Sequence, residues 1–581
     1  MRLIRLLPAL GLLLGSAQWA RAERPADVLL RLVPPEAGAT LAIEDLRTQA
    51  PRFWASPLSA GLMELAPVRR LLDSPPLVHF DKTCGEIERA LGRPRTAIRD
   101  QLLGEAVVLA LHLSPGEDPA RASGLLLLRF ADRALVDRFI KQINAAQTRD
   151  GTLVEVQQRV HRNQSYSVRI FKEGTKPEEY FAILPGRILA WSSSETAIQR
   201  VFDRVLGQPG LAQEPLFRKV RDQMPQAAVA SLFVNPRFLD RALAANAKTG
   251  KPDDERLGVL LGRNLGAVQY AGLAVEWRDG FVVHLEEAID PSKLDAPLLR
   301  WAKQPGSTAS LVGRVPSSAL ALAAGHIDLS AVYDEVLSLV SPAERDRFDN
   351  TLLVLKGLLQ GKDLATEVLP YVGPGAVAYF DAPEEDSGSP ARVPLVLAVS
   401  LAGSAEREGV TAALDNALRT FLAMHALDPN QRENQRHVET RVEAGVRVTT
   451  LLGAGRHLSY AIDRSLLVIG TSPRAVASFV AAAGQSGSNT RFERMRAAFF
   501  PKAESFAFAD LPAVYRFADA RRDLLARRAA SQGKPTEEEA RGRLDEALAL
   551  IKLFEGAFVT TRIESDFSAV HRTIGLVGAR R

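Results

Sequence analysis

Hydrophobic and polar positions follow one another along residues 183–210 in an order that predicts a strand, a tight turn, a second strand and a capped helix. Two short apolar runs flank Pro185-Gly186, a residue pair that favours a turn. Ser194 then fits a helix N-cap, and the apolar residues after it recur at three- and four-residue spacing. The pattern therefore predicts a hairpin followed by an amphipathic helix.

The same order of elements returns near the C-terminus, over residues 461–487. Ser472 is the expected cap there, and Pro473 takes the first helical position, where the missing N–H costs nothing. Other landmarks recur in the same order, including the strand histidines His284 and His571, which we expect to correspond. Because several landmarks in one order are harder to imitate than a single match, the sequence predicts an internal duplication.

The other apolar runs predict an α+β fold with two related halves, each a mostly antiparallel sheet with helices packed on one face. Short turns join the strands expected within residues 153–191, which favours antiparallel pairing because parallel neighbours need long crossovers. A hairpin is predicted over residues 270–289, turned at Asp279-Gly280. In the second half, the first strand is expected at Ala309–Val312.

The N-terminal residues have the pattern of a signal peptide. Two arginines precede an apolar run that is too short to span a bilayer, and a small-x-small cleavage site ends at Ala22. The predicted organisation is a signal peptide over residues 1–22, a first α+β domain over 23–290 and a second over 291–581. We expect a periplasmic or extracellular protein without a transmembrane segment.

Composition narrows the possible partners. Cys84 is the single cysteine, so no intrachain disulfide can form and stability must come from hydrophobic cores. The formal charge is +5, of which three arginines belong to the signal peptide, leaving +2 for the mature chain. Charges of both signs are spread along the sequence, which argues against nucleic-acid binding. An excess of Arg over Lys, with many Ala and Leu, is typical of GC-rich bacteria.

One serine has the setting of a hydrolase nucleophile. Gly484-Gln485-Ser486-Gly487 resembles the glycine-flanked serine that a sharp turn exposes. The corresponding Gly207-Gln208-Pro209-Gly210 has proline in place of that serine, and Ser488 interrupts the full motif. A turn that ends a helix is therefore the favoured interpretation.

Histidines and acids do not form a recognisable site in the sequence. None of the nine histidines has the spacing that places two metal ligands on one face of a strand or helix. His284 and His571 could meet at an interface, but a structural role on a strand is favoured. Glu286-Glu287 should point to opposite faces, and Glu384–Asp386 fits a solvated acidic loop. The sequence predicts no catalytic residue, no cofactor and no metal site.

The strand-turn-strand run into a Ser-capped helix, together with Phe233–Phe238, resembles an uncharacterised family of exported bacterial proteins known only as a domain of unknown function. The resemblance implies export and no particular activity. The leading hypothesis is a non-catalytic binding or structural module of the cell envelope with an unknown partner or ligand. The alternatives are an envelope hydrolase with a dispersed active site and a carrier of an apolar ligand. A deep polar pocket would favour the enzyme, and a broad apolar patch would favour binding.

Overall fold

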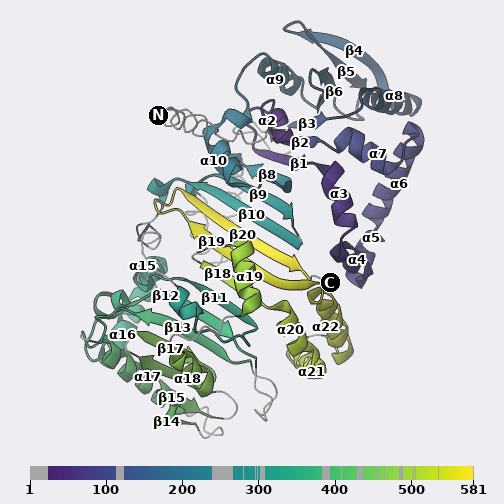
Figure 1. The fold of residues 1–581 in the computed structure, drawn as a ribbon. Coiled ribbons are helices and arrows are strands. Elements are labelled where there is room, and N and C mark those ends of the chain that lie inside the picture. The colour runs from purple at the N-terminus through teal and green to yellow at the C-terminus, as the bar shows by residue number, and fades with distance from the viewer. Residues whose placement is uncertain are drawn as a thin grey trace, which may run out of the picture. The chain divides into compact units, whose positions relative to one another are not determined.

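The structure is a computed structural model with the helices and strands shown in Figure 1. The signal peptide, Ser486 and Glu384–Asp386 lie outside the described residues. The structure describes residues 24–112, 123–238, 266–278, 280–294, 296, 299–300, 308–382, 393–406, 408–427, 436–453, 457–463, 465–482, 489–501, 503, 505–533 and 535–579.

The described residues form two compact units, each with its own run of antiparallel strands. The first unit contains the residues up to Pro51, those of Lys82–Arg218, and Ala228–Leu232. The second unit contains Arg52–Asp81, Lys219–Ala227 and the residues from Phe233 onward.

The sheet of the first unit is antiparallel, in the order β4-β5-β6-β7-β3-β2-β1. An eighth strand, β8, pairs with β1. Short connections join the strands that neighbour each other in sequence, as expected for antiparallel pairing. The strands are β1 (Ala39–Glu44), β2 (Ala106–His112), β3 (Ser123–Arg129), β4 (Leu153–His161), β5 (Gln164–Phe171), β6 (Glu179–Leu184), β7 (Ile188–Ser192) and β8 (Ala228–Val234).

Helices cover both faces of this sheet, so the expectation of helices on one face only is wrong. On β5, Tyr166 and Arg169 are three residues apart and therefore point to opposite faces. Phe202 of α9 lies 6.1 Å from the Tyr166 ring, whereas Arg169 bonds to Gln147 of α8. The helices with residues in this unit are α2 (Pro25–Leu30), α3 (Leu46–Trp54), α6 (Pro75–Leu91), α7 (Arg95–Ile98), α8 (Arg133–Arg149), α9 (Glu195–Val205) and α10 (Pro215–Gln223).

The sheet of the second unit is also antiparallel, in the order β9-β10-β20-β19-β18-β11-β12-β13-β17-β16-β15-β14. From β18 to β14 this order matches the order from β8 to β4 in the first unit. The strands are β9 (Val268–Trp277), β10 (Gly280–Ile289), β11 (Ala321–His326), β12 (Val372–Phe380), β13 (Leu395–Leu401), β14 (His437–Glu443), β15 (Val446–Leu452), β16 (Leu458–Asp463), β17 (Leu466–Gly470), β18 (Ser505–Ala509), β19 (Phe554–Ile563) and β20 (Ala569–Gly578).

Both faces of the second sheet also carry helices. Val468 of β17 packs in the core with Phe479 of α18, whereas the adjacent Leu467 packs with Val410 and Ala413 of α17. Helix α19 crosses strands β18 to β20, as Figure 1 shows, and buries Phe492 and Met495 in the same core as α18. The longer helices of this unit are α4 (Pro57–Glu64), α15 (Leu329–Leu339), α16 (Pro342–Leu358), α17 (Val410–Ala426), α18 (Pro473–Ala481), α19 (Thr490–Phe499), α20 (Leu511–Asp519), α21 (Arg522–Gln532) and α22 (Glu537–Ile551).

One predicted strand is wrong. Residues Ala309–Val312 form the short helix α14, in which the Val312 amide donates to the Thr308 carbonyl. Leu311 and Val312 are buried, which explains their apolar character, but a stretch of four residues is too short to show a period that separates a strand from a helix. The first strand of this half is β11, about ten residues later along the chain.

The predicted caps and the predicted hairpin are confirmed. Ser194 accepts a hydrogen bond from the Ala197 amide, and Ser472 accepts one from the Ala475 amide. These bonds satisfy amides that the helix itself leaves without partners. Strands β9 and β10 pair around the expected turn, of which Gly280 is described and Asp279 is not.

Candidate binding site

A shallow apolar hollow of about 450 Å³ lies on the sheet of the first unit. Leu41, Leu109, Leu126 and Trp191 form its floor, since they stand opposite one another across β1, β2, β3 and β7. Gly124 adds space, because a Cβ at that position would meet no atom within 4 Å. The hollow is thus a strip of sheet surface with large apolar side chains and a gap beside them.

The hollow exists because the apolar strip on this sheet face is longer than the helices that cover it. Val107 and Leu128 lie next along β2 and β3 on the same face, since strand residues two apart share a face. These two residues are buried with Leu135 and Val136 of α8. Beyond this cover Leu109 remains 43% exposed, which is uncommon for a strand leucine beside a core.

A fixed charged cluster borders the hollow at Glu179. The Arg169 guanidinium bonds to Glu179, is 1% exposed, and stacks between the rings of Phe171 and Trp191 at 5.1 and 5.0 Å. Burial lowers the pKa of Arg169, and the Glu179 carboxylate opposes that shift. Trp191 also stacks on Phe181 at 5.1 Å. Trp191 in the floor of the hollow is therefore held in place by Arg169 and Phe181, which pack against its ring.

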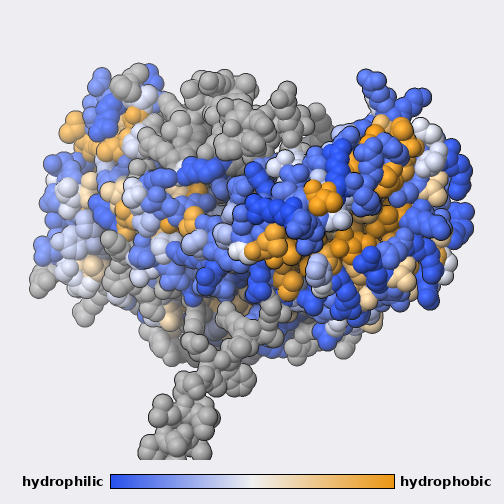
Figure 2. Space-filling model, turned by 90° about the horizontal axis from the view of Figure 1, so that it is seen from above, coloured by the Kyte–Doolittle hydropathy of each residue, from blue (hydrophilic) through white to orange (hydrophobic). Residues whose placement is uncertain are grey.

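The sheet of the second unit carries a longer exposed apolar strip. Each residue of the strip stands directly opposite the next across adjacent strands. Figure 2, which draws one face of the molecule from above, shows orange apolar surface among blue polar residues on that face. Ile574 is 50% exposed and Val559 is 43% exposed. The strip runs through Val275, Val283, Ile574, Val559, Ala507 and Ala323.

His571 of β20 lies between two carboxylates. Its Nδ1 contacts Glu286 of β10, and its Nε2 lies 3.1 Å from Oε1 of Glu564. Both ring nitrogens of His571 therefore face carboxylate oxygens. With both nitrogens occupied, His571 has no free position from which to activate a nucleophile.

His284 has a hydroxyl and a carboxylate for neighbours, the combination found in hydrolase triads. Its Nδ1 lies 3.4 Å from the Thr573 hydroxyl, and its Nε2 lies 3.5 Å from Glu276. However, Thr573 lies on β20, which pairs with β10 on one side and β19 on the other. Its neighbouring amides therefore belong to sheet ladders, which leaves no pair of amides for an oxyanion. The geometry favours a structural role.

The expected correspondence of His284 and His571 is wrong in register. The hairpins β9–β10 and β19–β20 each contain a bulge near their open end, at Ile289 and at Gly578. When residues are counted from these bulges, Thr573 occupies the position in β20 that His284 occupies in β10. The same two residues also pair with each other across β10 and β20. His571 instead pairs with Glu286.

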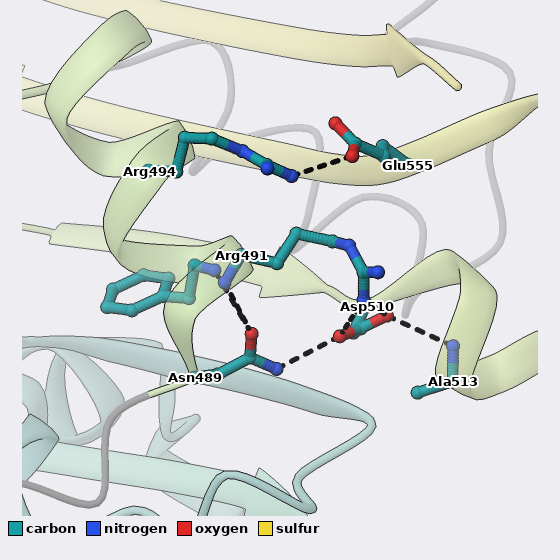
Figure 3. Close-up of polar contacts among 7 residues, drawn as sticks. Asn489, Arg491, Arg494, Asp510, Ala513 and Glu555 are labelled. Atoms are coloured by element: carbon teal, nitrogen blue, oxygen red, sulfur yellow. Dashed lines mark hydrogen bonds and ion pairs between the residues drawn. The ribbon is translucent and has the colours of Figure 1, made fainter. Parts of the chain in front are cut away.

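A buried ion pair joins the first turns of α19 and α20, as Figure 3 shows. The Arg491 guanidinium reaches both oxygens of Asp510 at 2.7 and 2.6 Å, and the Asn489 amide donates to Asp510 at 3.0 Å. Asp510 is 4% exposed and also caps α20 by accepting from the Ala513 amide. Because the carboxylate is fully used within the chain, this cluster positions two helices.

The remaining sequence candidates do not come together. Glu286 and Glu287 point to opposite faces as expected, since Glu286 contacts His571 and Glu287 bonds to Arg572. Cys84 lies half-buried in α6. The sequence analysis did not predict the apolar hollow, although the continuous apolar runs of β2 and β3, which place apolar side chains on both faces of the sheet, carry that signal.

The described residues contain neither a metal-binding cluster nor a helix that could cross a membrane. No group of three His, Cys, Asp or Glu residues in that part of the chain could hold a metal ion. Of the helices in the described ranges, none combines the length and apolar character needed to cross a membrane.

Comparison with known proteins gives a family without an assigned activity. No curated protein and no solved structure matches the chain. The family described as "Protein of unknown function (DUF3352)" matches residues 101–420, which is more than half of the sequence, and the chain therefore belongs to this family.

Proposed function

We propose that the chain is a non-catalytic binding module of the cell envelope, and that the hollow on the first sheet binds an apolar group. The observation that carries the proposal is the strip of exposed Leu109 and half-buried Leu126 and Trp191 beside a gap of about 450 Å³. Small-molecule sites have volumes of roughly 300–1,000 Å³ and are mostly apolar with a few polar groups. The hollow fits that description.

The border of the hollow limits which ligands fit. Glu179 already accepts a hydrogen bond from buried Arg169 and another from Lys176 at 2.7 Å. A ligand therefore gains little from Glu179 and must bind through apolar contact. An acyl chain or a flat hydrocarbon ring satisfies that condition, whereas a sugar or a nucleotide would leave polar groups without partners.

Export and duplication belong to the same proposal. The signal peptide of residues 1–22 supports delivery to the periplasm or the exterior, and the mature chain would begin at Glu23. The matching strand orders support two related halves, residues 23–290 and 291–581. N-terminal sequencing of the protein recovered from a cell-envelope fraction tests export, since a chain that still begins at Met1 in the cytoplasm would contradict it.

The neutral apolar dye N-phenyl-1-naphthylamine tests the binding site. Leu109→Lys places a charge on the floor of the hollow, and we expect it to weaken dye binding by about tenfold or more because a charge in an apolar site is costly. Leu397→Lys is the matched control, since Leu397 is 42% exposed on β13 of the second sheet. Circular dichroism melting confirms that both variants fold. Equal dye affinity in both variants, or no dye binding by the unaltered protein, would overturn the proposal.

A further inference from the structure

Strand β14 is the outermost strand of the second sheet among the described residues, and its outer edge carries backbone groups with no strand beside them. It pairs with β15 through seven residue pairs without a bulge. The two-residue turn Ala444-Gly445, with both φ angles positive, makes Glu443 and Val446 a hydrogen-bonded pair. By alternation, Val438, Thr440 and Val442 direct their N–H and C=O groups away from β15. An edge of this kind is a template for another strand.

The sequence of β14 is complementary to itself when it is read in the opposite direction. It reads His437-Val-Glu-Thr-Arg-Val-Glu443, with Thr440 at its centre. If a second β14 is laid antiparallel with the two Thr440 residues opposite each other, Glu439 faces Arg441 and Val438 faces Val442. His437 then faces Glu443. Opposite-charge and β-branched pairs of this kind stabilise neighbouring strands.

The alternative registers are unfavourable. Centring the pair on Glu439 would place two glutamates opposite each other, and centring it on Arg441 would place two arginines opposite each other. Like charges directly opposite one another destabilise a sheet. Centring on Thr440 also brings residues with outward-facing backbone groups opposite each other, as a hydrogen-bonded antiparallel pair requires.

The charges of β14 are not committed elsewhere in the described structure. Within those residues, Arg441 bonds to Glu439 of its own strand at 2.5 Å. Val442 is 71% exposed. Helix α18 covers this end of the sheet. Counted from the serine caps, it has Pro473 and Ala481 where α9 has Glu195 and Asp203, the two acids that bond to β4.

We propose that two copies of this chain associate through β14, antiparallel, with a two-fold axis at Thr440. The two second-unit sheets then continue into one another through about six backbone hydrogen bonds. The interface is isologous, so every favourable pair occurs twice and the assembly closes as a dimer. Because one strand pair buries little area, the dissociation constant is expected on the order of 10 μM. The proposal is independent of the apolar hollow.

Strand β4 provides an internal control, because it has the same place at the edge of the first sheet. Its turn also has two residues, so Val160 has an outward-facing N–H like Val442 and is 67% exposed. However, β4 contains a bulge between Leu153 and Glu155, and Arg159 and His161 bond to residues of α9. Bulges of this kind protect an edge from further pairing.

Proline substitutions at the two matched valines form the first test, with sedimentation velocity on the purified full chain as the measurement. Val442→Pro removes an outward-facing N–H without removing a bond to β15, a position that edge strands tolerate. We expect it to weaken dimerisation at least tenfold, whereas Val160→Pro leaves dimerisation unchanged. A monomeric unaltered chain well above 10 μM, or loss of the dimer with Val160→Pro but not Val442→Pro, would overturn the proposal.

Two single charge reversals form the second test. Glu439→Arg places like positive charges opposite each other in the dimer, and Arg441→Glu places like negative charges there. Each variant alone is expected to sediment as a monomer. Their equimolar mixture is expected to form a heterodimer, because both charged residues of the first variant are then positive and face two negative residues of the second. A contact outside β14 would not recover on mixing, and failure of the mixture to associate refutes the register. Circular dichroism melting confirms that each variant is folded.

Discussion

The edge hairpins of the two sheets have the same backbone design but different polar contacts. Hairpins β4–β5 and β14–β15 both turn through two residues and both end their sheets. In the first unit, Glu195 of α9 accepts from Arg159 at 2.7 Å and from Tyr166 at 2.6 Å. In the second unit, the residue at the same place after the serine cap is Pro473, whose side chain can accept nothing.

The difference shows that the polar contacts of such a hairpin can change while the apolar core beneath it is kept. Phe202 and Phe479 fill the same kind of core position under the two sheets, and each is 1% exposed. Among the described residues, the ion pairs that tie β4 to α9 have no counterpart between β14 and α18. The charges of β14 are consequently available for another use, which is the basis of the proposed dimer.

The largest effect is expected in both units, and it tests whether the two hydrophobic cores contribute equally to stability. Phe202→Ala and Phe479→Ala each leave a cavity, and each is expected to lower the free energy of unfolding of its unit by about 3–5 kcal/mol. Urea unfolding followed by circular dichroism is the measurement. The conservative Phe→Leu variants should lose clearly less. A large loss at only one of the two positions would break the comparison.

A smaller effect should appear only in the first unit. Glu195→Gln removes charge-assisted bonds to Arg159 and Tyr166, at an expected cost of about 1 kcal/mol after allowing for solvent screening of a partly exposed carboxylate. Pro473→Gln is the matched substitution in α18 and should change stability by less than about 0.5 kcal/mol. Equal losses in the two variants would show that the ion pairs do not distinguish the units.

The Glu195 carboxylate should also make the stability of the fold depend on pH in acid. Hydrogen bonds from Tyr166, and then from Arg159, lower the pKa of Glu195 below its ordinary value of 4.5. A lowered pKa stabilises the fold above the unfolded value and loses that stabilisation as pH falls through the folded value. Unfolding midpoints of the unaltered chain and of Glu195→Gln should therefore converge as pH falls from 4.5 through the lowered value. Curves that stay parallel in acid would contradict the assignment.

The smallest expected effect belongs to the second unit at alkaline pH. Burial, and then the bond to Asp415 of α17 at 2.8 Å, raise the pKa of Tyr460 to about 12. The resulting stabilisation is complete below about pH 10 and is lost as pH rises through the raised value. Tyr460→Phe should cost about 1 kcal/mol at neutral pH and should remove this alkaline dependence. If the stability of Tyr460→Phe fell at alkaline pH as much as that of the unaltered chain, this role of Tyr460 would be refuted.

Local features of the fold were predictable from the sequence, and long-range contacts were not. The serine caps and the β9–β10 hairpin depend on a few neighbouring residues, and those predictions agree with the structure. Ala309–Val312 was misassigned because a stretch of four residues fits a helix and a strand equally. The contact of His571 with Glu286 joins residues 285 positions apart, which no local spacing reveals. Buried Arg169 likewise depends on partners from separate elements.

The pairing of β10 with β20 has a consequence for biosynthesis. The ribosome makes β20 hundreds of residues after β10, so β10 lacks one of its two neighbours during that interval. During that interval a nascent chain exposes an open strand with apolar neighbours, which favours misassembly. Truncations that remove β20 should therefore harm a strand that was made long before it.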